Sequence, residues 1–266
     1  MTKIAVFGAN GRMGKVLCEA AASSAGNQLV GAYVRAGNDL IGTNVKNVVN
    51  STNTDITFTD ESLCFENVEV AIDFTLPAGM RNHLASALDS KTPMVIGTTG
   101  LSDQDMQALK EAAKHIPIVF ARNYSVGVNL LLNLVQTAAT KLGDDLDIEI
   151  FEAHHRHKID APSGTALAIG EAIAEAKEWD HDDVAVYDRS QVEKVKSQNE
   201  IGYSVLRGGD IVGEHTAYFA TSGERLELTH KASSRMTFAL GAVRAAGWLK
   251  NKPAGLYDMQ DVLDLK

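Results

Sequence analysis

The segment KIAVFGANGRMG, residues Lys3–Gly14, decides the fold of this 266-residue chain. The apolar run Lys3–Phe7 is typical of a buried strand and leads directly into three glycines spaced GxxGxxG, after which Met13–Ser23 has a helical pattern. Glycines allow a tight turn and close approach of the backbone to a pyrophosphate, and the helix N-terminus supplies N–H groups. The segment predicts a dinucleotide-binding βαβ unit; a purely structural turn is the alternative.

Apolar strands alternate with helical stretches through the first half of the chain. Such alternation indicates right-handed βαβ units and a parallel sheet. The asparagine-rich stretch Asp39–Thr54 is expected to be a loop. Further strands are predicted at Gln28–Val34, Val68–Phe74, Pro93–Ile96 and Ile116–Phe120, and helices near Pro77–Leu88 and Ser102–Lys114.

The pattern changes after Tyr124. Turn sequences at Gly208–Asp210 and Ser222–Glu224 separate three β-like runs and suit antiparallel neighbours. We therefore expect an α/β protein in which a Rossmann-like parallel-sheet domain is joined to an α+β domain with a mixed, mostly antiparallel sheet. The predicted elements are helices at Val126–Leu142, Gly164–Ala176 and Thr237–Leu249, strands at Asp147–Glu152, Gly202–Arg207, Val212–Ala220 and Arg225–His230, a surface loop or short helix within Trp179–Glu200, and a final turn in Tyr257–Leu263.

The composition excludes several classes of function. Lysine and arginine number 25 against 34 aspartates and glutamates, a formal net charge of −9, which argues against broad nucleic-acid or anionic-membrane binding. The two cysteines, Cys18 and Cys64, are too few for a disulfide framework and predict free thiols. No apolar run approaches the roughly 20 residues needed to span a bilayer, and no leader pattern precedes the first strand. We expect a cytoplasmic protein without nucleic-acid or membrane partners.

The end of the second strand predicts the cofactor. An acidic side chain there binds the ribose hydroxyls of NADH, whereas an arginine accommodates the extra phosphate of NADPH. Here the strand ends at Val34, Arg35 follows it, and no acid occurs before Asp39. We therefore expect NADPH to be preferred over NADH. The alternatives are that Arg35 is merely solvated, or that Lys3, Arg12 or Lys15 holds the phosphate.

Three of the eight histidines, His154, His155 and His157, lie within four residues together with Arg156 and Lys158. This is a concentration of positive charge in an acidic chain, as a polyanionic substrate requires. Zinc binding through Glu152 and the histidines is the weaker alternative, because the two cations repel a metal ion and no HExxH spacing is present. A solvated histidine loop is the remaining alternative. After the cluster, Ser163 can cap a helix whose Gly164 and Thr165 N–H groups would hold a carboxylate.

Taken together, the motifs resemble those of the dihydrodipicolinate reductase family. The run EAHHRHKIDAPSGTA at Glu152–Ala166 is the most specific of them. The resemblance extends from Lys3 almost to the C-terminus. The other matching motifs are GANGRMG at Gly8–Gly14, AIDFT at Ala71–Thr75, VIGTTG at Val95–Gly100, NYSVGVN at Asn123–Asn129, GEHT at Gly213–Thr216 and HKASSR at His230–Arg235.

The resemblance implies an NAD(P)H-dependent reduction of 4-hydroxy-tetrahydrodipicolinate in lysine and diaminopimelate biosynthesis, carried out by a homotetramer built through the second sheet. It implies a dinucleotide-binding domain of residues 1–125 and 236–266 and a substrate-binding and oligomerisation domain of residues 126–235. His154 would be the acid/base residue and Lys158 a proton donor. The substrate carboxylates would be held by His155, Gly164 and Thr165. The cofactor-binding residues would be Gly8, Ala9, Asn10, Gly11, Arg12, Met13, Arg35, Gly97, Thr98, Thr99, Ala121, Arg122, Asn123 and Tyr124.

One departure from the family pattern bears on the cofactor, and two alternative functions stay open. Family members often carry a glutamate at the end of the second strand, where this chain has Val34, and this departure again favours NADPH. A related Rossmann oxidoreductase acting on an amino acid or semialdehyde would share the glycine motif but not the histidine run. A non-catalytic dinucleotide sensor is the alternative from another class, and it would bind NADPH without turning over the cyclic imine.

Overall fold

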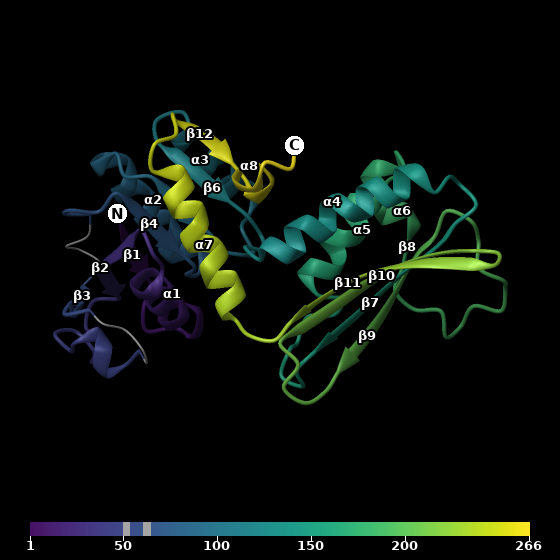
Figure 1. Cartoon of the computed structure of the whole chain (residues 1–266), viewed down its shortest axis with the longest axis horizontal. Helices are drawn as coiled ribbons and strands as arrows, with labels where there is room; N and C mark the ends of the chain where they lie inside the picture. Colours follow the sequence, from purple (N-terminus) through teal and green to yellow (C-terminus); the bar gives the residue numbers. More distant parts are fainter. Residues whose placement is uncertain (50–53, 61–64) are drawn as a thin grey trace. The chain divides into compact units, whose positions relative to one another are not determined.

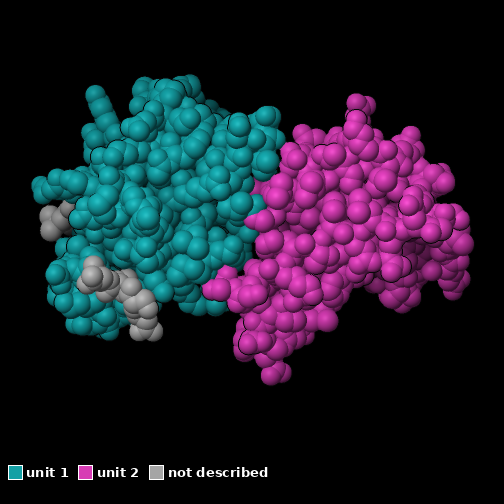
Figure 2. Space-filling view, in the orientation of Figure 1, with its two compact units in different colours: residues 1–126, 235–266 teal, residues 127–234 magenta. Residues whose placement is uncertain are grey.

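A computed structural model describes residues 1–49, 54–60 and 65–266. These residues form two compact units: Met1–Val126 together with Arg235–Lys266, and Gly127–Ser234 (Figure 2). The boundaries expected from the sequence, 125/126 and 235/236, lie within one residue of these junctions. The chain thus leaves the first unit once and returns to it for its last two helices (Figure 1).

The first unit contains a parallel sheet. Within the described ranges it has seven strands in the order β12-β6-β5-β4-β1-β2-β3, and every neighbouring pair is parallel. The strands are β1 (Thr2–Phe7), β2 (Asn27–Val34), β3 (Phe58–Asp60), β4 (Val70–Asp73), β5 (Met94–Ile96), β6 (Pro117–Phe120) and β12 (Gly255–Tyr257). This confirms the predicted parallel sheet.

Helices cover both faces of this sheet. Successive side chains of a strand point to opposite faces, so a single strand contributes to the core on each side. In β1, Ile4 and Val6 belong to a core with α1 (Arg12–Ser23), α7 (Met236–Leu249) and α8 (Met259–Leu263). Ala5 and Phe7 belong to a second core with α2 (Pro77–Ser90) and α3 (Asp103–Ala112) (Figure 1). The first unit is therefore a doubly wound α/β layer structure.

The strand order of the sheet reverses at β1. From this strand it extends one way through β2 and β3, and the other way through β4, β5 and β6. The loops after β1 and β4 therefore diverge at the carboxyl edge of the sheet. In open α/β sheets this edge, at the point where the strand order reverses, is where ligands bind.

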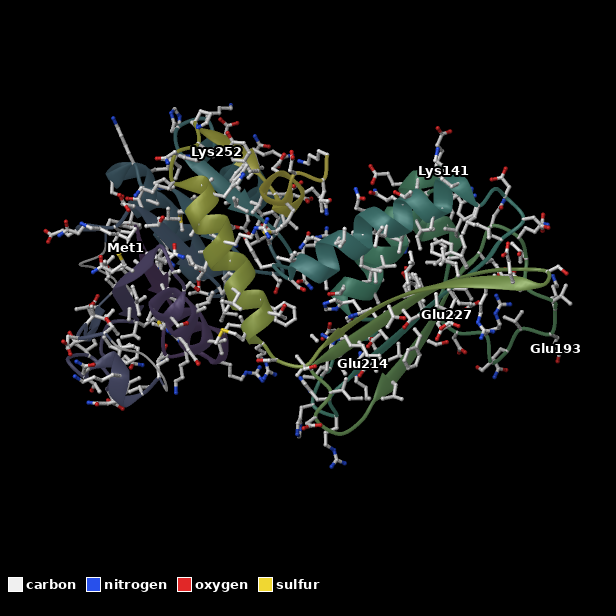
Figure 3. All side chains as sticks on the ribbon, viewed as in Figure 1. Met1, Lys141, Glu193, Glu214, Glu227 and Lys252 are labelled. Atoms are coloured by element: carbon white, nitrogen blue, oxygen red, sulfur yellow. The ribbon has the colours of Figure 1, made fainter. Side chains whose placement is uncertain are left out.

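The second unit contains a mixed sheet in the order β11-β10-β7-β9-β8. β10 is antiparallel to both β11 and β7, whereas β9 is parallel to both β7 and β8. The helices pack on one face of the sheet (Figure 1) around a core that includes Ile148, Ile150, Ala217 and Phe219. Glu214 and Glu227 project from β10 and β11 (Figure 3). The elements are α4 (Val126–Lys141), β7 (Asp147–His154), α5 (Gly164–Ala176), α6 (His181–Val184), β8 (Ala185–Val186), β9 (Ile201–Arg207), β10 (Gly213–Thr221) and β11 (Glu224–Ala232).

The structure corrects the sequence analysis at three places. The turn at Gly208–Asp210 does not join antiparallel neighbours, because β7 lies between β9 and β10. Strands β3, β8 and β12 were not predicted; each has only two or three residues, too short a run for a reliable pattern. The expected loop Asp39–Thr54 contains a short 3-10 helix, Val45–Asn47, while residues 50–53 lie outside the described ranges.

Two further expectations concern cysteines and membranes. Cys18 is a buried free thiol of α1, and burial raises its pKa to about 12, which makes it unreactive near neutral pH. Cys64 lies outside the described residues. None of the described helices combines the length and the apolar character needed to cross a bilayer.

Candidate active site

The glycine loop after β1 has no space for a side chain at Gly8 or Gly14. Gly8 adopts a φ of +63°, and a Cβ atom on Gly14 would lie 2.0 Å from the carbonyl oxygen of Gly8 and 2.7 Å from the Cα of Ala9. The loop therefore requires glycine at both positions. Gly11 is the N-cap of α1 and no side chain caps that end, which suits backbone N–H groups that bind a pyrophosphate. Asn10 and Arg12 are exposed beside them.

The end of β2 lies next to this loop, because the Ala9 N–H donates to the carbonyl of Tyr33 at 3.0 Å. Val34 is fully buried and Arg35 is exposed. Lys3, one alternative phosphate ligand, lies at the amino end of β1, roughly 16 Å of strand away from Gly8. Asp60 pairs with Val34 in register at the end of the unpredicted strand β3.

A buried carboxylate connects the loops at this edge of the sheet. Oδ1 of Asp73 accepts hydrogen bonds from the N–H and hydroxyl of Thr75, at 2.8 and 2.7 Å, and from the hydroxyl of Thr98 at 3.3 Å. Oδ2 lies 2.6 Å from Nδ1 of His83, whose ring stacks on Phe7. Asp73 follows from the AIDFT motif, but its role in joining two loops becomes visible only in the structure.

The segments predicted to meet the nicotinamide lie after β5 and β6. The ring of Phe74 occupies the space that a side chain at position 97 would fill, because a Cβ atom on Gly97 would lie 2.4 Å from Cζ of that ring. Thr98 is buried, whereas Thr99 and Arg122 are exposed.

Tyr124 is fully buried, and its hydroxyl lies 2.9 Å from the carbonyl oxygen of Ile96 and 3.0 Å from that of Val119. Its hydroxyl therefore supports both segments from inside the unit. Ala121 is buried, and Asn123 accepts the N–H of Ser125 at 2.8 Å.

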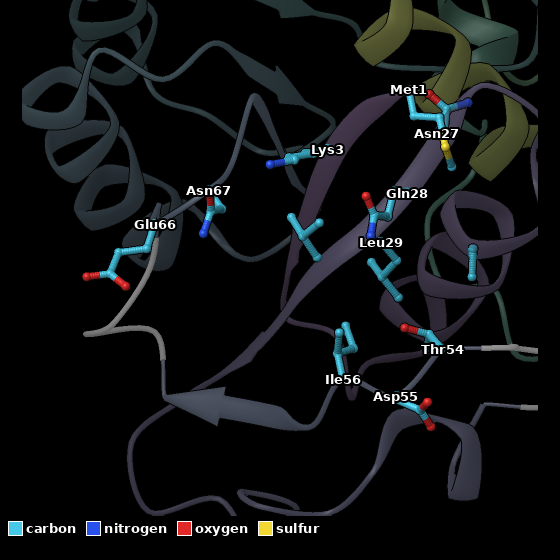
Figure 4. Close-up of a pocket in the computed structure, with 12 residues that line it drawn as sticks. Met1, Lys3, Asn27, Gln28, Leu29, Thr54, Asp55, Ile56, Glu66 and Asn67 are labelled. Atoms are coloured by element: carbon cyan, nitrogen blue, oxygen red, sulfur yellow. The ribbon is translucent and has the colours of Figure 1, made fainter.

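A separate hollow of about 750 Å³ lies at the amino ends of β1 and β2 (Figure 4). Met1, Lys3, Asn27 and Gln28 line it. It is at the edge of the sheet opposite the glycine loop. It is therefore not part of the candidate site.

The second unit contributes the histidine site. Strand alternation places Glu152 and His154 of β7 on the same face, and Oε2 of Glu152 lies 2.6 Å from Nδ1 of His154. Arg207 on the neighbouring strand β9 binds both oxygens of this glutamate at 2.7 Å. Burial raises the pKa of Glu152, but the hydrogen bonds from His154 and Arg207 outweigh it and lower that pKa to about 2. The carboxylate is therefore ionised throughout the physiological range.

The loop after β7 carries the other cluster residues. The His155 N–H donates to the carbonyl of Ile211 at 2.7 Å, and His157 is exposed. Nζ of Lys158 donates to both oxygens of Asp160, at 2.8 and 2.7 Å. Among the described residues, no three His, Cys, Asp or Glu side chains are grouped as metal ligands.

Helix α5 begins beside the histidine site. Ser163 is its N-cap and accepts the Ala166 N–H at 3.2 Å, which confirms the predicted cap. The Ser163 N–H donates to Oε1 of Glu152 at 3.0 Å, so one carboxylate connects the histidine to the start of the helix. Gly164 is exposed, and a Cβ there would meet no atom within 4 Å.

His215 of β10 completes the arrangement. The centroid of its ring lies 5.1 Å from that of the His154 ring, and the two rings are edge to face. Its Nε2 lies 2.9 Å from the hydroxyl oxygen of Ser163. Sequence reasoning had not assigned roles to His215, Arg207, Asp73 or His83. The GEHT motif pointed to His215, whereas nothing in the local sequence distinguished Arg207 from a solvated arginine.

Comparisons with known proteins decide the family. The model of the dihydrodipicolinate reductase N-terminus matches residues 2–124, and that of its C-terminus matches residues 127–263. This chain belongs to the dihydrodipicolinate reductase family. It is thus an oxidoreductase of lysine and diaminopimelate biosynthesis with a Rossmann-type first unit, and the resemblance inferred from the histidine run is confirmed.

Relatives of this family match over the whole chain. The 4-hydroxy-tetrahydrodipicolinate reductase of Pseudoalteromonas translucida is 75% identical over 264 residues, which cover 99% of this chain and 98% of that protein. The enzyme of the same name from Pseudomonas fluorescens is 55% identical and covers 100% of both. A dipicolinate-bound dihydrodipicolinate reductase from Paenisporosarcina has the same fold, with a TM-score of 0.73, 24% identity and 98% coverage of both chains.

Proposed function

We propose that this reductase converts 4-hydroxy-tetrahydrodipicolinate to tetrahydrodipicolinate with NADPH preferred over NADH, and that His154 and Lys158 supply protons. The single observation that carries the proposal is the buried His154, bonded through Nδ1 to Glu152, beside the start of α5. This combines a proton donor with a helix N-terminus suited to an anionic substrate. The names of the relatives support the choice of substrate.

The glycine loop fits a dinucleotide. Its backbone leaves no room for side chains at Gly8 and Gly14, and the uncapped start of α1 offers N–H groups to the pyrophosphate. Gly8–Met13, Gly97–Thr99 and Ala121–Tyr124 are the segments assigned to the cofactor. The bound nicotinamide supplies the hydride. Arg35, exposed after β2, is assigned to the phosphate that distinguishes NADPH from NADH.

His154 is the general acid. Reduction leaves negative charge on the substrate ring, and a positioned acid that delivers a proton in that step contributes about 10²–10⁴ in rate. With Nδ1 directed to Glu152, the donating atom is Nε2. Only 8% of the surface of His154 is exposed, so proton exchange with water is restricted.

Lys158 adds a positive charge in the loop after β7. Its ammonium group is bonded to Asp160, a mostly exposed carboxylate, and exposed ion pairs of this kind contribute only about 0–1 kcal/mol. An anionic substrate can therefore replace Asp160 at little cost. Gly164 and Thr165 N–H groups, together with His155, are assigned to the substrate carboxylates.

The assembly proposed is a homotetramer in the cytoplasm. The helix-free face of the second sheet carries Ser204 and Leu206, which are exposed, and an ion pair of 3.1 Å between Lys231 and Glu214. A sheet face of mixed polarity suits contact with a second copy. Light scattering of the purified enzyme would give the mass, with four chains expected and a monomer contradicting the assignment.

The function is tested by a spectrophotometric assay at 340 nm with freshly generated substrate and each cofactor in turn. Oxidation of NADPH that depends on the cyclic substrate is the expected result. Tight NADPH binding without turnover would favour the sensor alternative. Turnover of an amino acid or semialdehyde but not the cyclic substrate would favour a different Rossmann oxidoreductase.

A further inference from the structure

We propose that Glu152, clamped by Arg207, is the positioning residue of His154: it fixes the ring and keeps a hydrogen on Nδ1, so that Nε2 faces the substrate. The inference rests on the proposed role of His154 as the acid. It assigns a function to two residues, one on β7 and one on β9, that do not touch the reacting atoms.

Both oxygens of the Glu152 carboxylate are hydrogen-bonded. Oε1 accepts the Ser163 N–H at 3.0 Å and Nη2 of Arg207 at 2.7 Å. Oε2 accepts Nη1 of Arg207 at 2.7 Å and lies 2.6 Å from Nδ1 of His154. The side chain is 1% exposed. A carboxylate bonded from three directions has no freedom to rotate, and neither does the imidazole that it holds.

The protonation of this carboxylate determines the histidine tautomer. An ionised carboxylate only accepts hydrogen bonds, so the histidine nitrogen that faces it must carry the hydrogen. Glu152 is ionised near neutrality because the bonds from His154 and Arg207 outweigh its burial. In the neutral ring Nε2 is then the free base, and in the charged ring it is the donor. A second residue that orients a catalytic histidine in this way is a general feature of acid–base sites.

The space around Nε2 supports the same orientation. Gly213, at the start of β10, lies so close that a Cβ there would be 3.0 Å from Nε2 of His154. Any larger residue at that position would crowd the donating atom. The absence of a side chain on Gly213 therefore keeps the reactive nitrogen accessible.

Other titratable groups also lie near the pair. His215 on β10 is edge-on to His154, and its pKa is lowered to about 3 by burial and then by His154, so it is neutral near pH 7. Lys158 and His230 also act on His215 electrostatically. Arg207 carries a permanent charge opposite that of Glu152. Glu152 is thus the negative charge bonded directly to the His154 ring.

The primary test is Glu152→Gln, which keeps the shape but removes the charge. We expect kcat to fall by about 10²–10⁴, the full contribution of a positioned acid, with the substrate KM changed less than about threefold. The pH profile of kcat should also change, because the negative charge beside the imidazole is lost. Glu149→Gln on the same strand, where Lys196 is the ion-pair partner, is the matched control and should leave both quantities unchanged.

A double variant separates positioning from a structural role. In the His154→Gln background, Glu152→Gln should reduce kcat less than about twofold further, because the residue acts through His154. A full additional loss would contradict the inference, as would an unchanged pH profile in Glu152→Gln itself. If His154→Gln alone keeps wild-type turnover, the proposed function fails instead.

The tautomer can be measured on the wild-type enzyme, which keeps the inference testable even if Glu152→Gln does not fold. In ¹⁵N-labelled protein, the side-chain nitrogens of His154, assigned by comparison with His154→Gln, report which one carries hydrogen. We expect the Nδ1–H form in the neutral ring. Observation of the Nε2–H form would overturn the inference.

Discussion

Nε2 of His215 lies 2.9 Å from the hydroxyl oxygen of Ser163, the N-cap of α5. That oxygen also accepts the Ala166 N–H, so the hydroxyl proton can be donated to His215 only while its ring is neutral. Burial, and next the nearby His154, lowers the pKa of His215 to about 3. The Ser163 hydroxyl can therefore donate to this ring only while the histidine is uncharged.

This relationship predicts how stability depends on pH. As pH falls below 6.5, the unfolded chain protonates this histidine, whereas the folded chain does so only near pH 3. Its contribution is therefore complete above pH 6.5 and is lost as pH falls towards 3, by at most about 1.4 kcal/mol per pH unit. Urea unfolding of wild type and His215→Asn at pH 7.5, 6.5 and 5.5 measures it. Equal slopes in the two proteins would contradict this role.

Asp73 should affect cofactor binding more than chemistry. Asp73→Asn cannot accept all of the hydrogen bonds from Thr75, Thr98 and His83, so the loops beside the glycine motif lose their shared anchor. Bonds to a charged group are worth about 1.5–3 kcal/mol, and we expect the NADPH KM to rise roughly tenfold or more with kcat reduced less than about threefold. Affinity for pyridine-2,6-dicarboxylate is the control and should stay constant. An unchanged NADPH KM would show that the anchor is only structural.

Gly164 tests the substrate assignment of α5. Because a Cβ there meets no protein atom, Gly164→Val should fold normally while its side chain covers the start of the helix. We expect pyridine-2,6-dicarboxylate to inhibit the wild type competitively and to lose at least about tenfold in affinity in the variant, with NADPH affinity unchanged. Equal losses for both ligands would mean that the helix serves the fold rather than the substrate.

A feature of this structure could be predicted from the sequence when the residues that determine it lie close together in the chain. The glycine loop and α5 could be predicted because their determinants are local: a strand, a glycine turn and Ser163 as a cap. The Gly208–Asp210 turn was misread because the insertion of β7 between β9 and β10 is set by non-local pairing. The Arg207–Glu152 contact spans 55 residues of sequence, and no periodicity could indicate it. Likewise, Asp73 stood in a recognised motif, but its partner Thr98 comes from another loop.

Arg35 tests the cofactor preference. The structure leaves Arg35 exposed after β2 and Val34 buried, so we expect a lower KM for NADPH than for NADH by roughly ten- to a hundredfold with similar kcat. Arg35→Ala should remove the difference mainly by raising the NADPH value. Arg12→Ala and Lys15→Ala, measured in parallel, would identify the phosphate ligand if Arg35 is not the one. Equal KM values in the wild type would rule out the preference.

The most direct test of the central claim is kcat of His154→Gln at saturating cofactor and substrate. The exposed His157 lies three residues further along the chain, in the loop after β7, and His157→Gln provides the matched control. Lys158→Ala, measured alongside, should also lower kcat, with some loss of substrate affinity. If His154 is the acid, its variant loses about 10²–10⁴ in kcat while substrate affinity is nearly kept and the control retains its activity. Wild-type turnover by His154→Gln would contradict the account.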